Sequence, residues 1–120
     1  MPNIPSLDDN LEMITAPLFQ NTLKALTRGI EKEGLRVDQN NNLAQSPHPL
    51  QLGSALTNPW LTTDFSESLL EFVTPTFQNS DDALNYLFDC HAYTSNHLQD
   101  ELIWPTSMPC VLPEDDALPL

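Results

Sequence analysis

The sequence contains very little positive charge. Only four of its 120 residues are lysine or arginine, against 17 aspartates and glutamates, and the formal net charge at pH 7 is −13. A chain this acidic repels nucleic-acid phosphates and anionic membrane surfaces, so we expect neither as a direct partner. All four basic residues lie between positions 24 and 36, and twelve of the acids follow Arg36. We expect metal ions, a partner or further polypeptide to supply the missing counter-charge; the alternative is an adaptation of the source to salt or cold.

Cysteines and long apolar runs are scarce as well. Cys90 and Cys110 are too few for a disulfide scaffold and fit a reducing compartment. No stretch approaches the roughly 20 apolar residues of a membrane-spanning helix, and the N-terminus lacks the basic start and apolar core of a secretory signal. We therefore expect a cytoplasmic protein of at most one domain that does not associate with a membrane.

The hydrophobic pattern predicts two helical pieces before the first strand. Ser6 is a suitable N-cap, acids follow it in the first turn, and apolar residues recur at helical spacing until Pro17 interrupts them. A second piece ends near Gly29, and both pieces are expected to pack on the rest of the fold. We expect one segment over residues 1–120, with irregular ends at residues 1–5 and 113–120.

Beyond Gly29 the pattern predicts strands and helices in turn. A strand over residues 30–38 can pair back with residues 43–44, and a short helix is expected over 50–56. A second strand ends at Pro75, and the best helix runs from a cap at Ser80 to about residue 100. The apolar stripe of that helix is expected to cover a sheet and consists of Leu84, Leu87, Phe88 and His91.

Glutamates occupy unusual positions on both strands. On the first strand, Glu31 and Glu33 share a face with Leu35 and Val37, because side chains alternate with period two. On the second strand, Glu71 has apolar neighbours two residues before and after it. Carboxylates on an inward face need a cation, which a bound metal ion often supplies. The alternative is an edge strand whose glutamates face water.

Structural roles are open to the other chemically active side chains. Asp64 and Glu67 have the D-x-x-E spacing of a helix start, so capping is an alternative role for Asp64. Cys90 is expected in or near the core, and Cys110 as a structural or redox-sensitive thiol. The three histidines stand apart from other potential ligands, and we expect them at the surface or in packing: His48, His91 and His97.

Three blocks of sequence resemble a known family. Residues 29–37 read GIEKEGLRV, residues 52–75 read LGSALTNPWLTTDFSESLLEFVTP, and residues 104–110 read WPTSMPC. In this order they resemble the N-terminal part of the proteobacterial glutamate–cysteine ligases, over roughly residues 22–110. One departure is Gly34, where the family pattern has threonine. The resemblance implies an α+β fold: part of a glutamine-synthetase-like antiparallel sheet with packing helices, incomplete as a stand-alone domain.

The resemblance also implies an activity. Family members use ATP to join the γ-carboxylate of L-glutamate to the amine of L-cysteine through a γ-glutamyl phosphate, the first step of glutathione synthesis. They use Mg²⁺ or Mn²⁺, and the acids that match the family's metal-binding carboxylates are Glu31, Glu33, Asp64 and Glu71. ATP phosphates would then be bound through the metal, and no residue of this segment is assigned a catalytic role. Lys32 and Arg36, on the opposite face of their strand, are expected to form salt bridges.

The family's enzymes are several times longer than this chain. The resemblance therefore implies that the remainder of a longer polypeptide carries the cysteine site and much of the nucleotide site, and that this segment alone is inactive. Two alternatives stay open: a related ligase that joins glutamate to another amine, and a non-catalytic acidic fragment that binds metal or a basic partner.

Overall fold

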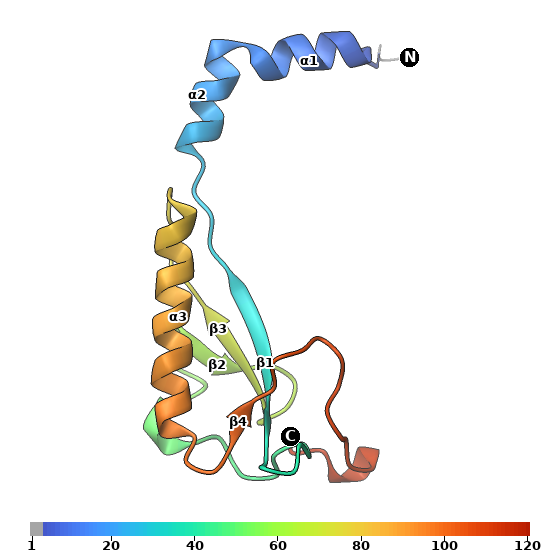
Figure 1. Ribbon diagram of the computed structural model, residues 1–120, viewed down its shortest axis with the longest axis vertical. Coiled ribbons are helices and arrows are strands. Elements are labelled where there is room, and N and C mark those ends of the chain that lie inside the picture. Colours follow the sequence, from blue (N-terminus) through green and yellow to red (C-terminus); the bar gives the residue numbers. More distant parts are fainter. Residues whose placement is uncertain (1–3) are drawn as a thin grey trace.

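A four-stranded antiparallel sheet organises the chain, whose computed structural model describes residues 4–120. The strands are β1 (Glu31–Val37), β2 (Leu61–Thr63), β3 (Leu69–Val73) and β4 (Leu102–Ile103), and they lie in the order β2-β3-β1-β4 (Figure 1). The two long strands therefore lie side by side in the middle of the sheet. The expected α+β class with an antiparallel sheet is confirmed.

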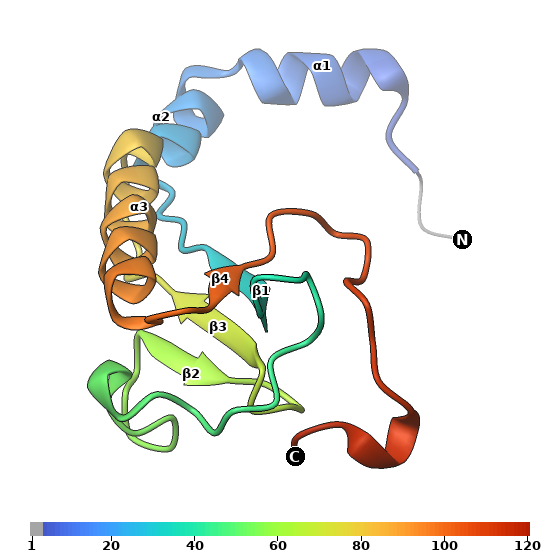
Figure 2. The ribbon, with the colours of Figure 1, turned by 60° about the horizontal axis from the view of Figure 1, so that its bottom comes forward.

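One long helix, α3 (Ser80–His97), covers one face of the sheet (Figure 2). Beneath it Leu70 and Phe72 are fully buried, and the His91 ring stacks on the Phe72 ring with centroids 4.2 Å apart. Further residues of this core are Leu52, Leu61, Leu87, Cys90, Leu98 and Ile103. The prediction that this helix covers a sheet is confirmed.

The face by which α3 contacts the sheet differs from the expected stripe. Leu84 and Phe88 are 56% and 71% exposed, whereas Ala83 and Thr94 are buried. Leu87 and His91 of the expected stripe do pack on the core, and Ala83 and Thr94 share their face because these positions recur at helical spacings of three and four residues. The N-cap is also one residue earlier than expected, because the Asn79 side chain accepts the Asp81 N–H.

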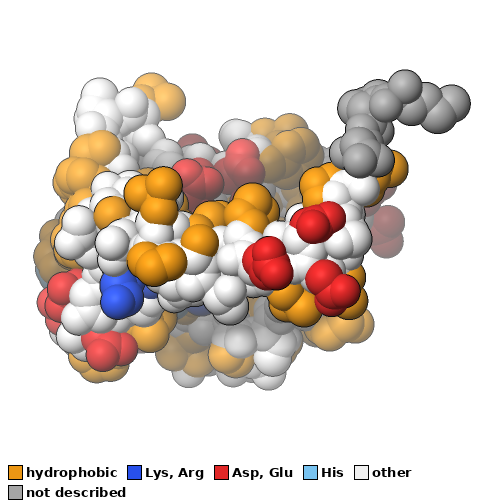
Figure 3. Space-filling model, turned by 90° about the horizontal axis from the view of Figure 1, so that it is seen from above, with side chains coloured by type: hydrophobic (Ala, Val, Ile, Leu, Met, Phe, Trp, Pro, Cys, Tyr) orange, Lys and Arg blue, Asp and Glu red, His pale blue; other side chains and the backbone are white. Residues whose placement is uncertain are grey.

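The two N-terminal helices extend away from the sheet (Figure 1). Helix α1 (Leu7–Thr15) begins with a capping box between Ser6 and Asp9, and α2 (Pro17–Ala25) begins at the proline that ends α1. The described residues of both helices include no buried side chain, so the expectation that they pack is not met here. Seen from above, their apolar side chains lie open at the surface (Figure 3).

The segments between the strands contain less helix than the sequence pattern predicted. The expected helix over 50–56 is only a 3₁₀ turn, Leu50–Leu52, because Gly53 takes a left-handed φ of +85° that ends it. Val37 and Leu43 form the expected hairpin bridge. Of the ends expected to be irregular, residues 1–3 lie outside the described part, and 113–120 contain a 3₁₀ turn at Asp115–Ala117.

Gly34 leaves room for the Ile103 side chain of β4. A Cβ atom at this position would lie 2.9 Å from the Ile103 Cγ2 atom, which is too close without a shift of the backbone or of the isoleucine. The departure from the family's threonine therefore goes with a tight contact at the edge of the sheet. Among residues 4–120, no helix is long and apolar enough to cross a membrane.

Candidate metal centre

The strand register brings two glutamates of the expected set face to face. Glu33 on β1 is the direct partner of Glu71 on β3, and Glu31 lies two residues along the same strand, opposite Val73. Directly opposite residues of an antiparallel pair have Cβ atoms about 4.5–5.5 Å apart. These three glutamates therefore share the face of the sheet that is turned away from α3, since Phe72 and Lys32 pair on the other side. Glu31 and Glu33 are exposed there and Glu71 is half-buried, so the glutamates of β1 face solvent as in the alternative interpretation, although β1 is a central strand and not an edge strand.

Asp64 joins this face from a third segment. Thr62 on β2 pairs with Glu71, and Asp64 follows two residues later in the turn from β2 to β3, where its N–H donates to the Leu69 carbonyl over 3.1 Å. No helix begins here, so the capping interpretation of Asp64 is wrong. The next residue, Phe65, has a strained φ of +55° and is 78% exposed.

Three of the carboxylates act electrostatically on the fourth, Glu71. Burial raises the pKa of Glu71 above its ordinary value, and the charges of Glu31, Asp64 and Glu33 raise it further. Within residues 4–120, none of the four side chains takes part in an ion pair, and the single ion pair joins Arg36 to Glu101. The carboxylate face thus carries negative charge that the described residues leave uncompensated.

Lys32 does not supply the missing cation. Its Nζ atom lies over the Phe72 ring, 5.6 Å from the centroid, and donates to the Glu33 carbonyl oxygen over 3.2 Å. Burial lowers the pKa of Lys32. The expected salt bridge of this lysine is therefore not formed with any described residue, because the side chain is used to cover the aromatic ring on the α3 side.

The donor set fits a hard divalent cation that is only partly held by protein. Carboxylate oxygens are the protein ligands that Mg²⁺ prefers, and it commonly uses one or two of them together with water and substrate phosphates. In the described part of the chain, no group of three or more His, Cys, Asp or Glu side chains is arranged closely enough to hold a metal ion. The carboxylate face is therefore open, and a bound ion would need further ligands from water or substrate phosphates.

A hollow adjoins the carboxylate face. Its volume is ≈ 360 Å³, and its walls come from Glu33, Leu35 and Leu69 on the strands and from residues 106–109. The Trp104 Nε1 donates to the Met108 carbonyl over 2.7 Å and so shapes the wall formed by residues 106–109. The hollow places apolar and polar surface directly beside a proposed metal ligand.

A buried network escaped the sequence patterns. Arg36 is completely buried and forms its expected salt bridge, with Nη1 2.6 Å from the Glu101 Oε2. His48, expected at the surface, is half-buried, and neither ring nitrogen has a hydrogen-bond partner among the described residues. Burial, followed by the Arg36 charge, lowers the pKa of His48. The Pro-His-Pro loop gave no sign of this, because the groups that surround His48 come from distant segments.

The remaining histidines and cysteines agree with their expected structural roles. His91 packs on Phe72, and His97 lies against the Tyr93 ring. Cys90 is half-buried and Cys110 is buried, and burial raises the pKa of both thiols.

Removing one charge from the carboxylate face should stabilise the metal-free chain. We expect Glu33→Gln to raise the Tm by about 1–5 °C at neutral pH in EDTA, since like charges directly opposite each other cost roughly 0.2–1 kcal/mol. The raised pKa of Glu71 sets the sign: the repulsion is absent at low pH, where Glu71 is protonated, and grows as the pH rises through that pKa.

Thermal unfolding followed by circular dichroism between pH 4 and 8 measures this effect. Glu114→Gln, which removes a charge from the exposed tail, is the matched control and should leave the Tm unchanged. A Glu33→Gln variant that is less stable than the parent chain at pH 7 would contradict the prediction.

Comparison with known proteins identifies the family. The model of the family described as glutamate-cysteine ligase matches residues 11–120. A glutamate–cysteine ligase from Saccharophagus degradans is 55% identical over 98 residues, which are 82% of this chain and 18% of the relative. One from Sodalis glossinidius is 48% identical over 117 residues, 98% of this chain and 22% of the relative. The chain thus spans about a fifth of the length of these relatives.

Two solved structures share the fold. A glutamate–cysteine ligase from Francisella tularensis in complex with AMP has a TM-score of 0.73 and 44% identity, covering 77% of this chain and 18% of that one. A bifunctional glutathione synthetase from Pasteurella multocida has a TM-score of 0.75 and 34% identity, covering 82% and 14%. With the match over residues 11–120, these likenesses show that the chain belongs to the glutamate–cysteine ligase family.

Proposed function

We propose that this chain forms the metal and ATP-phosphate side of an enzyme that joins the γ-carboxylate of L-glutamate to the amine of L-cysteine. The observation that carries the proposal is the set of four uncompensated carboxylates, brought from β1, β3 and the β2–β3 turn onto one open face. Membership of the ligase family and the AMP bound to the Francisella tularensis relative support a nucleotide as the partner of that face.

The residues proposed to hold Mg²⁺ or Mn²⁺ are Glu31, Glu33, Asp64 and Glu71. When bound, the divalent ion supplies positive charge that neutralises the phosphates of ATP during phosphoryl transfer. The chain's own part is to fix the carboxylates in space: residues two apart on a strand are about 7 Å apart, and the paired strand adds Glu71 across from Glu33. Such fixed donors position the nucleotide for transfer of a phosphoryl group to the glutamate carboxylate.

The chain contributes little positive charge of its own to this face. On β1, the strand that carries two of the acids, both basic side chains point to the other side: Lys32 covers Phe72, and Arg36 is paired with Glu101. We therefore propose that further polypeptide supplies the groups that bind the substrate carboxylates and the cysteine, as part of a cytoplasmic enzyme.

A chimera tests this proposal. In it the 120-residue chain replaces the matching fifth of the Sodalis glossinidius ligase, with which it aligns over 117 residues. We expect the chimera to release phosphate in a reaction that requires ATP, glutamate and cysteine together, and we expect the isolated chain to release none. Phosphate release followed at saturating Mg²⁺ is the measurement.

Two results would count against the proposal. A chimera that folds and binds AMP but releases no phosphate would show that the chain cannot serve as this part of a ligase. Ligation by the isolated 120-residue chain would show that the proposed need for further polypeptide is wrong.

A further inference from the structure

Arg36 is the most completely buried charged group among the described residues. Its side chain is 0% exposed, yet it lies on β1 only three residues from Glu33. A guanidinium can be buried at low cost only when its N–H groups are bonded and its charge is paired. Both terminal nitrogens of Arg36 are bonded, whereas its Nε has no hydrogen-bond partner among the described residues. The groups that bond the guanidinium therefore indicate which segments Arg36 holds in place.

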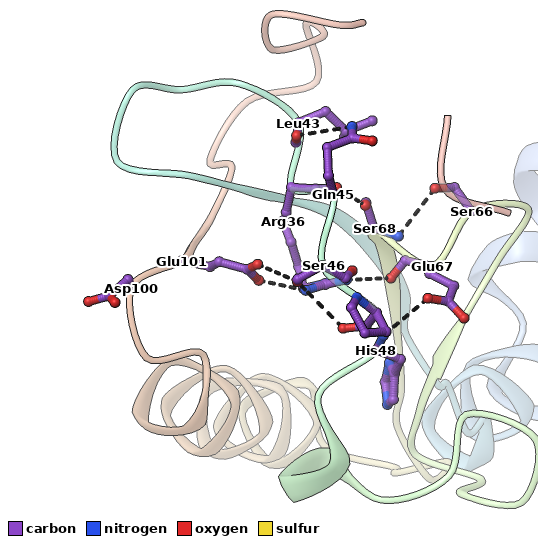
Figure 4. A network of polar contacts seen from close by, with 12 residues as sticks. Arg36, Leu43, Gln45, Ser46, His48, Ser66, Glu67, Ser68, Asp100 and Glu101 are labelled. Atoms are coloured by element: carbon purple, nitrogen blue, oxygen red, sulfur yellow. Dashed lines mark hydrogen bonds and ion pairs between the residues drawn. The ribbon is translucent and has the colours of Figure 1, made fainter. Parts of the chain in front are cut away.

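The guanidinium joins three segments that are distant in the sequence (Figure 4). Nη1 donates to the Glu101 carboxylate and, over 2.7 Å, to the Ser46 hydroxyl, while Nη2 donates over 2.7 Å to the Ser46 carbonyl. Nη2 also donates over 3.1 Å to the Glu67 carbonyl. The second carboxylate oxygen of Glu101 accepts a hydrogen bond from the Ser46 hydroxyl. One side chain thus fixes the loop at Ser46, the segment after α3 and the turn at Glu67.

The Glu67 contact matters for the carboxylate face. Glu67 lies within the β2–β3 turn, between the two acids that this turn and the following strand contribute, Asp64 and Glu71. A backbone hydrogen bond also links β1 to this turn, because the Arg36 N–H donates to the Ser68 carbonyl over 2.7 Å. The strand that carries Glu31 and Glu33 is therefore tied at Arg36 to the turn that carries Asp64.

We propose that Arg36 is a positioning residue for the divalent-cation site: it sets the place of Asp64 relative to the glutamates of β1 and β3 by holding the β2–β3 turn. The inference rests on the proposed function. Arg36 does not contact the carboxylates of that site; it acts through the Glu67 carbonyl. Lysine cannot replace it, because a single ammonium lacks the planar fork that bonds Glu101, Ser46 and the Glu67 carbonyl together.

Arg36→Lys tests the inference in the 120-residue chain, with two measurements. Titration with Mn²⁺ followed by electron paramagnetic resonance should show binding about tenfold weaker or more, the scale seen when groups that orient metal ligands are removed. Amide hydrogen exchange should become faster in the turn, at Ser66 and Leu69, and stay slow at the β1–β3 pairs such as Lys32 with Phe72.

A destabilised control separates positioning from simple loss of stability. Leu87→Ala weakens the core beneath α3 without touching the turn, so it should lower the Tm and leave the Mn²⁺ affinity within twofold of the parent chain. Equal Mn²⁺ affinity in Arg36→Lys and the parent, or turn amides that exchange no faster, would overturn the inference. If the parent chain itself binds no Mn²⁺, the proposed function fails, and the exchange of the turn amides still decides whether Arg36 holds the turn.

Discussion

Replacing Arg36 by methionine should lower the free energy of unfolding by about 3–5 kcal/mol, because removing one partner of a buried ion pair leaves the other charge uncompensated. Glu101, whose side chain is only 17% exposed, would lose the Nη1 donor, and the Ser46 and Glu67 carbonyls would lose Nη2. Domains of this size are stable by only about 5–15 kcal/mol. We therefore expect a largely destabilised chain, measured by urea unfolding followed by circular dichroism at 25 °C.

Arg28 offers a matched control for this substitution. Arg28 is exposed and makes one side-chain hydrogen bond, from Nη1 to the Ser80 hydroxyl over 2.9 Å. Arg28→Met should therefore cost about 0.5 kcal/mol or less, as for other surface positions. Equal losses of stability in Arg36→Met and Arg28→Met would show that the buried Arg36 network stabilises the fold no more than a surface hydrogen bond does.

Replacing Glu71 by glutamine should reduce phosphate release by the chimera on the order of 100-fold or more. Glutamine keeps the shape of the side chain and one oxygen but loses the charge. Removing a group that only orients a metal ligand typically lowers metal affinity or activity by about 10–100-fold. Loss of a direct ligand is therefore expected to lower the rate by at least about 100-fold. Glu71 is the central member of the set, since Glu33 and Thr62 pair with it from the two sides.

The effect should appear in kcat at saturating ATP, because the proposed ions act while the phosphoryl group is transferred. Glu114→Gln in the same chimera is the control, since Glu114 is exposed in the tail, and its rate should match that of the parent chimera. A Glu71→Gln chimera that retains a third or more of the parent rate would remove Glu71 from the proposed ligands.

The local parts of the carboxylate face were predictable from the sequence. Alternation with period two placed Glu31 and Glu33 on one face of β1, and the apolar neighbours of Glu71 marked a strand that Pro75 ends. What alternation could not give is which strand pairs with which, or in what register. The direct pairing of Glu33 with Glu71, and the third side supplied by Asp64 from the β2–β3 turn, are properties of the assembled sheet.

The helix faces and the buried network were predicted less well, and for physical reasons. Hydrophobicity assigned Leu84 and Phe88 to the contact face of α3 along with Leu87 and His91, but only the latter two pack on the core, since the sheet meets the helix along the face that also holds Ala83. The Arg36 network joins residues up to 65 positions apart, which no local pattern contains. The open apolar surface of α1 and α2 is likewise a property that the helical spacing of their residues did not reveal.

Binding of Mn²⁺ to the 120-residue chain is the measurement on which the proposed metal site depends most. At this site the four acids of the open sheet face are proposed to hold divalent cations. We predict saturable binding by electron paramagnetic resonance that Mg²⁺ displaces, that Glu114→Gln leaves unchanged, and that Glu71→Gln weakens at least about tenfold. Equal Mn²⁺ affinities for the parent chain and Glu71→Gln would contradict the proposed site.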